Sequence, residues 1–196
     1  MKKRRLLVAV TGLSLLLGAC GFMEDVDTTT ISVDKKGAVK ETIIEDFDKD
    51  YYDATELSQM IEQEINEYNS KFSAGGNVEL SSCEEIADGA QIKVVIEYAA
   101  STDYQDMNGR VLFAGTVSDA YNAGYEFVSM QSADGQSVDA AKVLELGDKY
   151  MVISEEALSI KAAGKILYVS EGVSIVGDKT AVLPDDGEKL SYIIYE

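Results

Sequence analysis

The sequence predicts an α+β fold with a mainly antiparallel sheet, one long amphipathic helix at about residues 53–72 and a C-terminal β-meander. Three observations lead to this prediction. Apolar residues recur every three or four positions in one stretch, which is typical of a helix with one buried face. They alternate with polar residues in several other stretches, which is typical of half-buried strands. After Lys149, short strand-like runs follow one another closely, with turn residues between them.

The long helix is predicted within the segment YYDATELSQMIEQEINEYNSKF. Asp53 is placed to cap its N-terminus, and Glu56 follows three residues later, at the spacing of a capping box. The glycines at 75 and 76 are expected to end it. Its apolar residues form one stripe, which predicts that the helix packs on the core; they are Leu57, Ile61, Ile65, Tyr68 and Phe72.

Strands are predicted at residues 38–47 (AVKETIIEDF), 91–98 (QIKVVIEY) and 124–130 (GYEFVSM), because apolar and polar residues alternate in each. Two short helices are predicted between the last two of these strands, near residues 102–107 and 117–123. Six further strand-like runs make up the expected meander, at residues 149–154, 157–162, 165–170, 173–176, 180–183 and 191–195.

The N-terminus has the organisation of an export signal. Met1 to Arg5 is a positively charged block, and Leu6 to Leu17 is an apolar run of twelve residues. A membrane-spanning helix needs about 20 apolar residues, so this run is too short to cross a bilayer. A charged start, a short apolar middle and small residues at the end are instead typical of a cleaved signal peptide.

The last four residues of this segment are Leu17, Gly18, Ala19 and Cys20. They resemble the lipobox of bacterial lipoproteins, in which an aliphatic residue and two small residues precede a cysteine. The resemblance implies that the signal peptidase recognises Leu17, Gly18 and Ala19 and that Cys20 becomes lipidated. Two or three acyl chains give a stable membrane anchor, whereas one gives only marginal binding. The alternative is an ordinary secretory signal in which Cys20 is incidental.

This reading divides the chain into a signal peptide at 1–19, a lipidated cysteine with a short tether at 20–28, and a single globular domain at 29–196. A hydrophobic content of 46% argues against disorder, and one proline in 196 residues argues against a proline-rich linker. The mature protein is expected on the extracytoplasmic face of the cell membrane. Its composition is similar to that of small lipoproteins of Gram-positive bacteria.

The charge of the chain excludes some partners. Its net charge is −18, and removal of the first 19 residues takes away four of 17 basic residues and none of 35 acidic ones, leaving about −22. Nucleic-acid binding needs clustered Lys and Arg, so no nucleic acid is expected as a partner. Such a charge also repels anionic lipid, so the acyl chains on Cys20 must hold the membrane, and it favours a monomeric domain.

The sequence lacks the catalytic residues that several classes of enzyme require. Histidine is absent, which removes the commonest general base and the Ser-His and Cys-His nucleophile systems. No nucleotide-binding motif is present either, and no cofactor is expected. A hydrolase that uses two carboxylates remains open, since acidic residues are abundant. We therefore expect a protein that is not an enzyme.

One acidic segment resembles the start of a calcium-binding loop. Asp46, Asp48 and Asp50 alternate as the first ligands of an EF-hand loop do. The sixth position, however, is Tyr51 where the loop needs glycine, and the twelfth is Leu57 where it needs glutamate. The same residues also fit a solvated strand end that leads into a capped helix, so no metal site is predicted there.

The two cysteines predict no intrachain disulfide, because lipidation of Cys20 leaves Cys83 without a partner. Cys83 is expected to be a half-buried filler, and two adjacent glutamates argue against a reactive thiolate.

The function expected from these observations is that of a non-enzymatic accessory or protein-binding module at the cell envelope. The alternative is a lipoprotein that senses a small ligand or cation, and a carboxylate-dependent envelope hydrolase comes third. The three differ in what a structure should contain. A protein-binding module needs an exposed apolar or aromatic patch of roughly several hundred Å². A sensor needs an enclosed pocket with a few convergent polar groups, and a hydrolase needs two carboxylates beside a cleft, one of them with a raised pKa.

Overall fold

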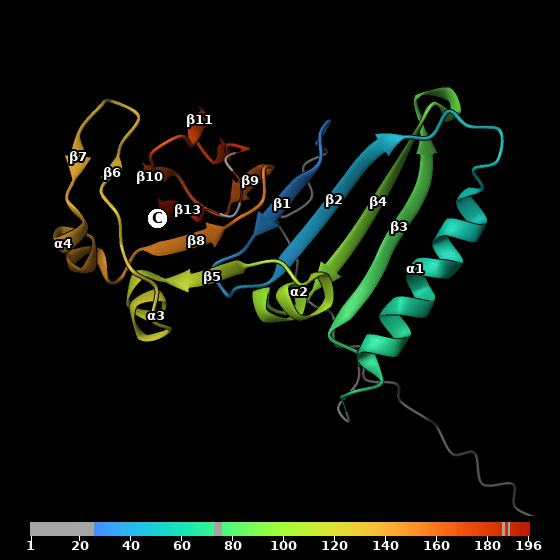
Figure 1. Cartoon of the computed structure of the whole chain (residues 1–196), viewed down its shortest axis with the longest axis horizontal. Helices are drawn as coiled ribbons and strands as arrows, with labels where there is room; N and C mark the ends of the chain where they lie inside the picture. The colour runs from blue at the N-terminus through green and yellow to red at the C-terminus, as the bar shows by residue number, and fades with distance from the viewer. Residues whose placement is uncertain (1–25, 73–75, 186, 188) are drawn as a thin grey trace, which may run out of the picture.

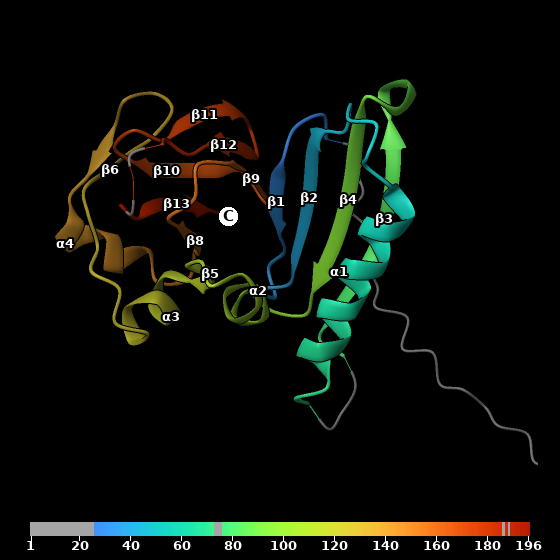
Figure 2. The same cartoon turned by 45° about the vertical axis from the view of Figure 1, so that its right-hand side comes forward.

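The computed structural model describes residues 26–72, 76–185, 187 and 189–196 (Figure 1). Its strands form two sheets. The seven-stranded sheet has the order β11-β12-β9-β1-β2-β4-β3, and the six-stranded sheet has the order β5-β8-β13-β10-β6-β7. β1 and β9 pair in parallel, and every other pair among the described strands is antiparallel. Figure 2 shows that the strands of the six-stranded sheet run across the direction of β1 to β4.

The strands of the seven-stranded sheet are β1 (Thr30–Val33), β2 (Val39–Asp46), β3 (Val78–Ile86), β4 (Gln91–Tyr98), β9 (Ser159–Ala162), β11 (Ser174–Gly177) and β12 (Thr180–Val182). Those of the six-stranded sheet are β5 (Leu112–Thr116), β6 (Met130–Gln131), β7 (Ser137–Val138), β8 (Tyr150–Ser154), β10 (Ile166–Ser170) and β13 (Ser191–Tyr195). The helices are α1 (Ala54–Asn69), α2 (Ser101–Asn108), α3 (Val117–Asn122), α4 (Ala140–Val143) and the short 3₁₀ helices η1 (Ala87–Gly89) and η2 (Leu144–Leu146).

Two clusters of buried apolar side chains hold these elements together. The first, the shared core, takes residues from both sheets, among them Ile31 and Ile160 of the larger sheet and Val152 and Tyr195 of the smaller one. The second cluster lies on the other face of the six-stranded sheet, where α3, α4 and the β6 region cover it. β13 contributes to both, because successive side chains of a strand point to opposite faces.

The fold-class prediction is wrong in its architecture, although the protein is α+β in the broad sense. There are two sheets rather than one, and the C-terminal strands do not form a meander. Of the consecutive pairs after Lys149 only β11 and β12 are neighbours, while β8 pairs with β5 and β13, and β9 pairs with β1 and β12. Alternation identifies a strand from its own residues, but the choice of partner depends on contacts far away in the sequence.

The predicted long helix is also wrong, because α1 has 16 residues and ends at Asn69. Asp53 caps it as predicted, since its carboxylate accepts the N–H groups of Thr55 and Glu56. At the C-terminal end of α1, the side chain of Asn69 forms three hydrogen bonds with the backbone at the start of β3. Its oxygen accepts the N–H groups of Asn77 and Val78, and its amide donates to the carbonyl of Val78. These bonds fasten the end of α1 to the start of β3, so the chain turns before Phe72.

None of the helices in the described part of the chain combines the length and the apolarity that crossing a membrane requires.

The turn between β3 and β4 stores backbone strain. Ala87 has φ 51° and Asp88 has φ 56°, in the left-handed region where a Cβ atom is unfavourable. Ala87 is exposed, so its methyl group contributes little packing. We expect Ala87→Gly to raise the free energy of unfolding by about 0.5–1 kcal/mol, measured by urea titration. Ala90, in the same loop, has φ −79°, and Ala90→Gly should lower stability by about as much. Equal losses in both variants would contradict the assignment of strain.

Candidate functional site

A hollow lined by aromatic side chains lies on the side of the six-stranded sheet that α3 and α4 cover. It starts with α3, whose N-terminus is closed by a capping box: the hydroxyl of Thr116 accepts the N–H of Asp119, and the Asp119 carboxylate accepts the N–H of Thr116. Hydrogen bonds from Thr116 lower the pKa of Asp119. The helix ends at Asn122, and Gly124, with a φ of 91°, then lets the chain reverse.

After this turn the segment Tyr125–Ser129 runs into β6. It is followed by the β6–β7 hairpin and by α4 and η2, so the chain returns to the side of α3. Together these pieces form a hollow of about 650 Å³ that is open to solvent. We call it the aromatic groove; its lining residues are Tyr121, Gly124, Tyr125, Glu126, Phe127, Ala140, Ala141 and Leu144.

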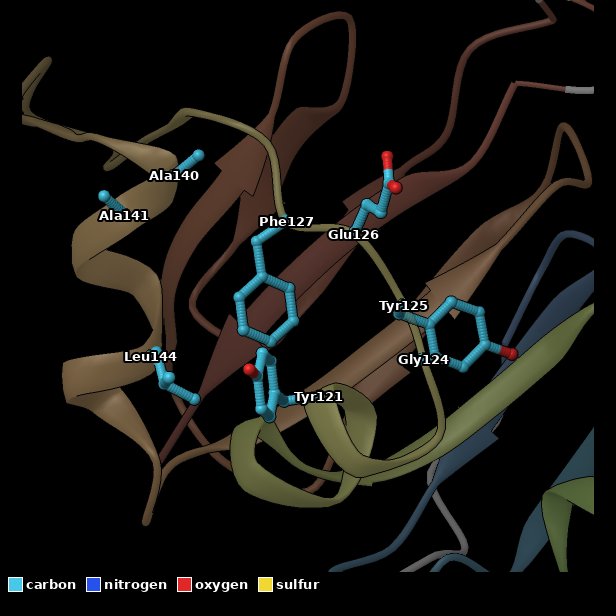
Figure 3. Close-up of a pocket in the computed structure, with 8 residues that line it drawn as sticks. All are labelled: Tyr121, Gly124, Tyr125, Glu126, Phe127, Ala140, Ala141 and Leu144. Atoms are coloured by element: carbon cyan, nitrogen blue, oxygen red, sulfur yellow. The ribbon is translucent and has the colours of Figure 1, made fainter.

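Two aromatic rings form one wall of the aromatic groove (Figure 3). The ring centroids of Tyr121 and Phe127 are 6.3 Å apart, and Leu144 faces them from the other side. Tyr121 is 57% exposed and Leu144 is 42% exposed, so both side chains are accessible from solvent. Tyr125 turns away from them and packs on Phe113, with ring centroids 5.3 Å apart.

A second group of polar side chains lies where the two sheets meet; its two tyrosines are buried, its two carboxylates are half-buried and Asn108 is exposed. The hydroxyl of Tyr98 donates to Glu41 (2.7 Å), that of Tyr104 donates to Glu156 (2.6 Å), and the Asn108 amide donates to the Tyr98 hydroxyl (3.2 Å). We call these five residues the carboxylate–tyrosine cluster. It connects β2 and β4 of the larger sheet, through α2, to the segment after β8 of the smaller one. Neither carboxylate lines the aromatic groove.

Burial raises the pKa of the Glu41 carboxyl; the hydrogen bond from Tyr98 opposes this, and the nearby charge of Glu156 adds to it. Burial likewise raises the pKa values of the Tyr98 and Tyr104 hydroxyls, so both remain protonated donors. The cluster therefore holds two carboxylates close enough to interact, each bound by a tyrosine.

Because the pKa of Glu41 is raised in the folded chain, its contribution to the free energy of unfolding decreases as the pH rises. The folded chain holds the Glu41 proton more tightly than the unfolded chain, whose pKa is 4.5. The stability that the folded chain gains by binding this proton is fully present below pH 4.5 and is lost as the pH rises through the pKa of Glu41 in the folded chain. We expect Glu41→Gln to unfold at the same urea concentration as the wild type at pH 4 and to be more stable by about 0.5–2 kcal/mol at pH 8. Glu45→Gln, at an exposed position of the same strand, is the control and should show no such difference.

The residues singled out from the sequence do not come together in a site. Leu17, Gly18, Ala19 and Cys20 lie outside the described residues. Asp46 ends β2, Asp48 forms an ion pair with Lys49 (2.8 Å), and Asp50 lies in the turn before α1.

Across the described ranges, no three His, Cys, Asp or Glu side chains are grouped so that they could hold a metal ion. Cys83 is half-buried and packs against the shared core, and burial raises the pKa of its thiol.

Sequence reasoning missed both the aromatic groove and the carboxylate–tyrosine cluster. For the cluster a signal was present: Glu41 shares its strand face with Val39 and Ile43, where an apolar residue is expected. For the groove no comparable signal exists, because its walls come from two separate stretches of chain, 121–127 and 140–144. Comparisons of the chain with protein-family models, with curated proteins and with solved structures found no match.

Proposed function

We propose that this protein is a lipid-anchored extracytoplasmic module that binds another protein of the cell envelope through the aromatic groove. The observation that carries the proposal is the exposed ring of Tyr121, beside the half-buried ring of Phe127 and opposite the exposed Leu144. Exposed apolar patches mark interaction sites in soluble domains, and the groove gathers three large apolar side chains at one place. Tyrosine and phenylalanine are also enriched in the centres of protein interfaces.

The shape of the groove favours a protein partner over a small ligand. Small-molecule sites enclose most of the ligand and place a few polar groups around it. Here the walls are themselves largely exposed, and Glu126 is the one charged side chain of the lining. A protein surface can cover such walls, whereas a small molecule would leave them in water.

The hydrolase reading receives less support. Glu41 and Glu156 do interact, and the pKa of Glu41 is raised, as a general acid requires. Yet a hydroxyl of Tyr98 or Tyr104 already occupies an oxygen of each carboxylate. The cluster ties two sheets together, and this structural role accounts for its geometry.

The binding half of the proposal is tested by photo-crosslinking in intact cells. A photoreactive phenylalanine analogue is placed at Tyr121, or at Met60 as the control, since Met60 is equally exposed on α1. We expect one envelope protein to be linked from position 121 at least tenfold more than from position 60. The double variant Tyr121→Ser, Leu144→Ser should lose the same partner in chemical crosslinking. Equal labelling from both positions, or none, would overturn the assignment of the groove.

The anchor is tested separately with Cys20→Ser. Loss of the acylated cysteine should release the protein from the membrane fraction or leave it with its signal uncleaved. Normal processing together with unchanged membrane retention would show that Cys20 carries no anchor.

A further inference from the structure

The segment Tyr125–Ser129 has a sequence typical of a strand, but in the described part of the chain no other strand pairs with it. Apolar, aromatic and polar residues alternate through YEFVS, a pattern typical of strands. In the structure, however, β6 begins only at Met130, and the five residues before it pair with no strand. Figure 3 shows them as an open run of chain beside the aromatic groove.

The missing partner can be traced to β7. Met130 pairs with Val138 and Gln131 with Ser137, so a longer β7 would continue alongside residues 129, 128 and 127. Instead the chain turns into α4 at Ala140 and leaves the sheet. The aromatic groove occupies the place that the continued strand would have filled, between the segment and α4. Ala140 and Ala141 line it there with the smallest side chains available to a helix.

The backbone of the segment is free to receive a strand. Successive N–H groups of an extended segment point to opposite edges, and Ser132, two residues after Met130, donates its N–H to Gln136 on the β7 side. Glu126 and Val128 share that edge, and among the residues that the structure describes their N–H groups donate to no protein acceptor. The carbonyl of Glu126 accepts a hydrogen bond from the hydroxyl of Tyr192 (2.9 Å), which fixes the segment in place. A fixed extended segment with unpaired donors at a sheet margin is the arrangement to which extended peptides add.

The acidic side chains around the aromatic groove favour a basic strand as its occupant. Between Thr116 and Lys149 the chain carries six carboxylates and two lysines. Asp119, Glu126, Asp139 and Glu145 are all exposed around the groove. A second copy of this acidic chain would be repelled, whereas a segment with Lys or Arg would be attracted. Side chains of a strand alternate, so its other face would offer apolar residues to Tyr121, Phe127 and Leu144.

We propose that an extended, basic segment of a partner protein, with apolar residues alternating with Lys or Arg, adds as a strand beside Tyr125–Ser129. It takes the position vacated by β7 and extends the six-stranded sheet. This inference rests on the proposed function and specifies the partner of the same groove.

The test uses the full chain in nonionic detergent and a fluorescent ten-residue peptide of alternating Val and Lys. Two comparison peptides carry Glu in place of Lys, or N-methyl groups on the amides of one strand edge. Binding is followed by anisotropy, and hydrogen exchange of the backbone amides of Glu126 and Val128 is followed by mass spectrometry. We expect the Val-Lys peptide to slow this exchange at least tenfold and both comparison peptides to bind at least tenfold more weakly.

The variant Ala141→Trp fills the groove from an exposed position and should reduce binding of the Val-Lys peptide at least tenfold without lowering the melting temperature. Equal binding of the N-methylated peptide would overturn strand addition, and so would the absence of exchange protection at Glu126 and Val128. If either occurs while position 121 still crosslinks an envelope protein in cells, the groove remains a protein-binding site and only the strand mode is wrong. Failure of both experiments overturns both proposals.

Discussion

Deletion of residues 191–196 is expected to leave the chain unfolded. These residues form β13, the strand between β8 and β10, and all five of its residues are buried. Ile193 and Tyr195 pack in the shared core, while Tyr192 and Ile194 pack in the second cluster. Truncating a buried isoleucine to alanine costs about 2–5 kcal/mol and truncating a buried aromatic about 3–5 kcal/mol. Loss of all four side chains therefore costs about 10–20 kcal/mol, which matches or exceeds the roughly 5–15 kcal/mol by which domains are stable.

The deletion is measured by far-ultraviolet circular dichroism and limited proteolysis at 25 °C. Removal of Glu196 alone is the matched control, because this residue is exposed and its backbone N–H makes one hydrogen bond, to the carbonyl of Lys165. The control should unfold cooperatively with a loss of about 1 kcal/mol. A cooperative thermal transition in the deletion variant would show that the two clusters can form without β13.

The second large effect is expected from Tyr98→Phe. The hydroxyl of this buried tyrosine is the donor that holds the Glu41 carboxylate and also accepts a hydrogen bond from Asn108. Without it, a half-buried charge loses its partner, which costs about 1.5–3 kcal/mol. The hydrogen bond from Tyr98 favours the ionised form of Glu41, so its removal raises the Glu41 pKa further. The loss of stability should therefore be large at pH 8 and small at pH 4.

Tyr192→Phe provides the comparison, because the Tyr192 hydroxyl donates to a neutral carbonyl, that of Glu126. Its loss should cost about 0.5–1.5 kcal/mol at both pH values. Combining Tyr98→Phe with Glu41→Gln should remove most of the pH dependence, and urea titrations of the four species form a double-mutant cycle. A loss from Tyr98→Phe that is equal at pH 4 and pH 8 would mean that Glu41 is not the group concerned.

The alternation of residues in the sequence predicted where the strands lie better than it predicted how they are arranged in sheets. The strand predicted at 91–98 is β4, and the alternation at 38–47 contains β2. Each of these predictions depends on side chains within a few residues of one another. The distribution of strands over two sheets depends instead on contacts such as Ile31 with Ile160. Nothing in the neighbourhood of either residue encodes that pairing, so a meander was predicted where none exists.

The aromatic groove illustrates the same limit. Phe127 lies in a segment predicted as a strand, and Tyr121 lies in one predicted as a short helix; the helix is α3. The strand prediction is wrong for residues 125–129, because β7 has only two residues and supplies no partner. The lipobox differs from both, since Leu17 to Cys20 form a linear motif that needs no fold. Lipidation at Cys20 stays a prediction, because these residues lie outside the described part of the chain.

The parallel pairing of β1 with β9 has a consequence for the order of folding. β2, β4 and β3 are close in the sequence and can associate early, and β1 can join β2 through a short turn. The other edge of β1 must wait until residues 159–162 have been made, and closing so long a loop is entropically slow. A chain interrupted before Ser159 therefore presents β1 as an unprotected edge, and open strand edges recruit other chains. Incomplete synthesis is thus the stage at which this protein is most prone to aggregate.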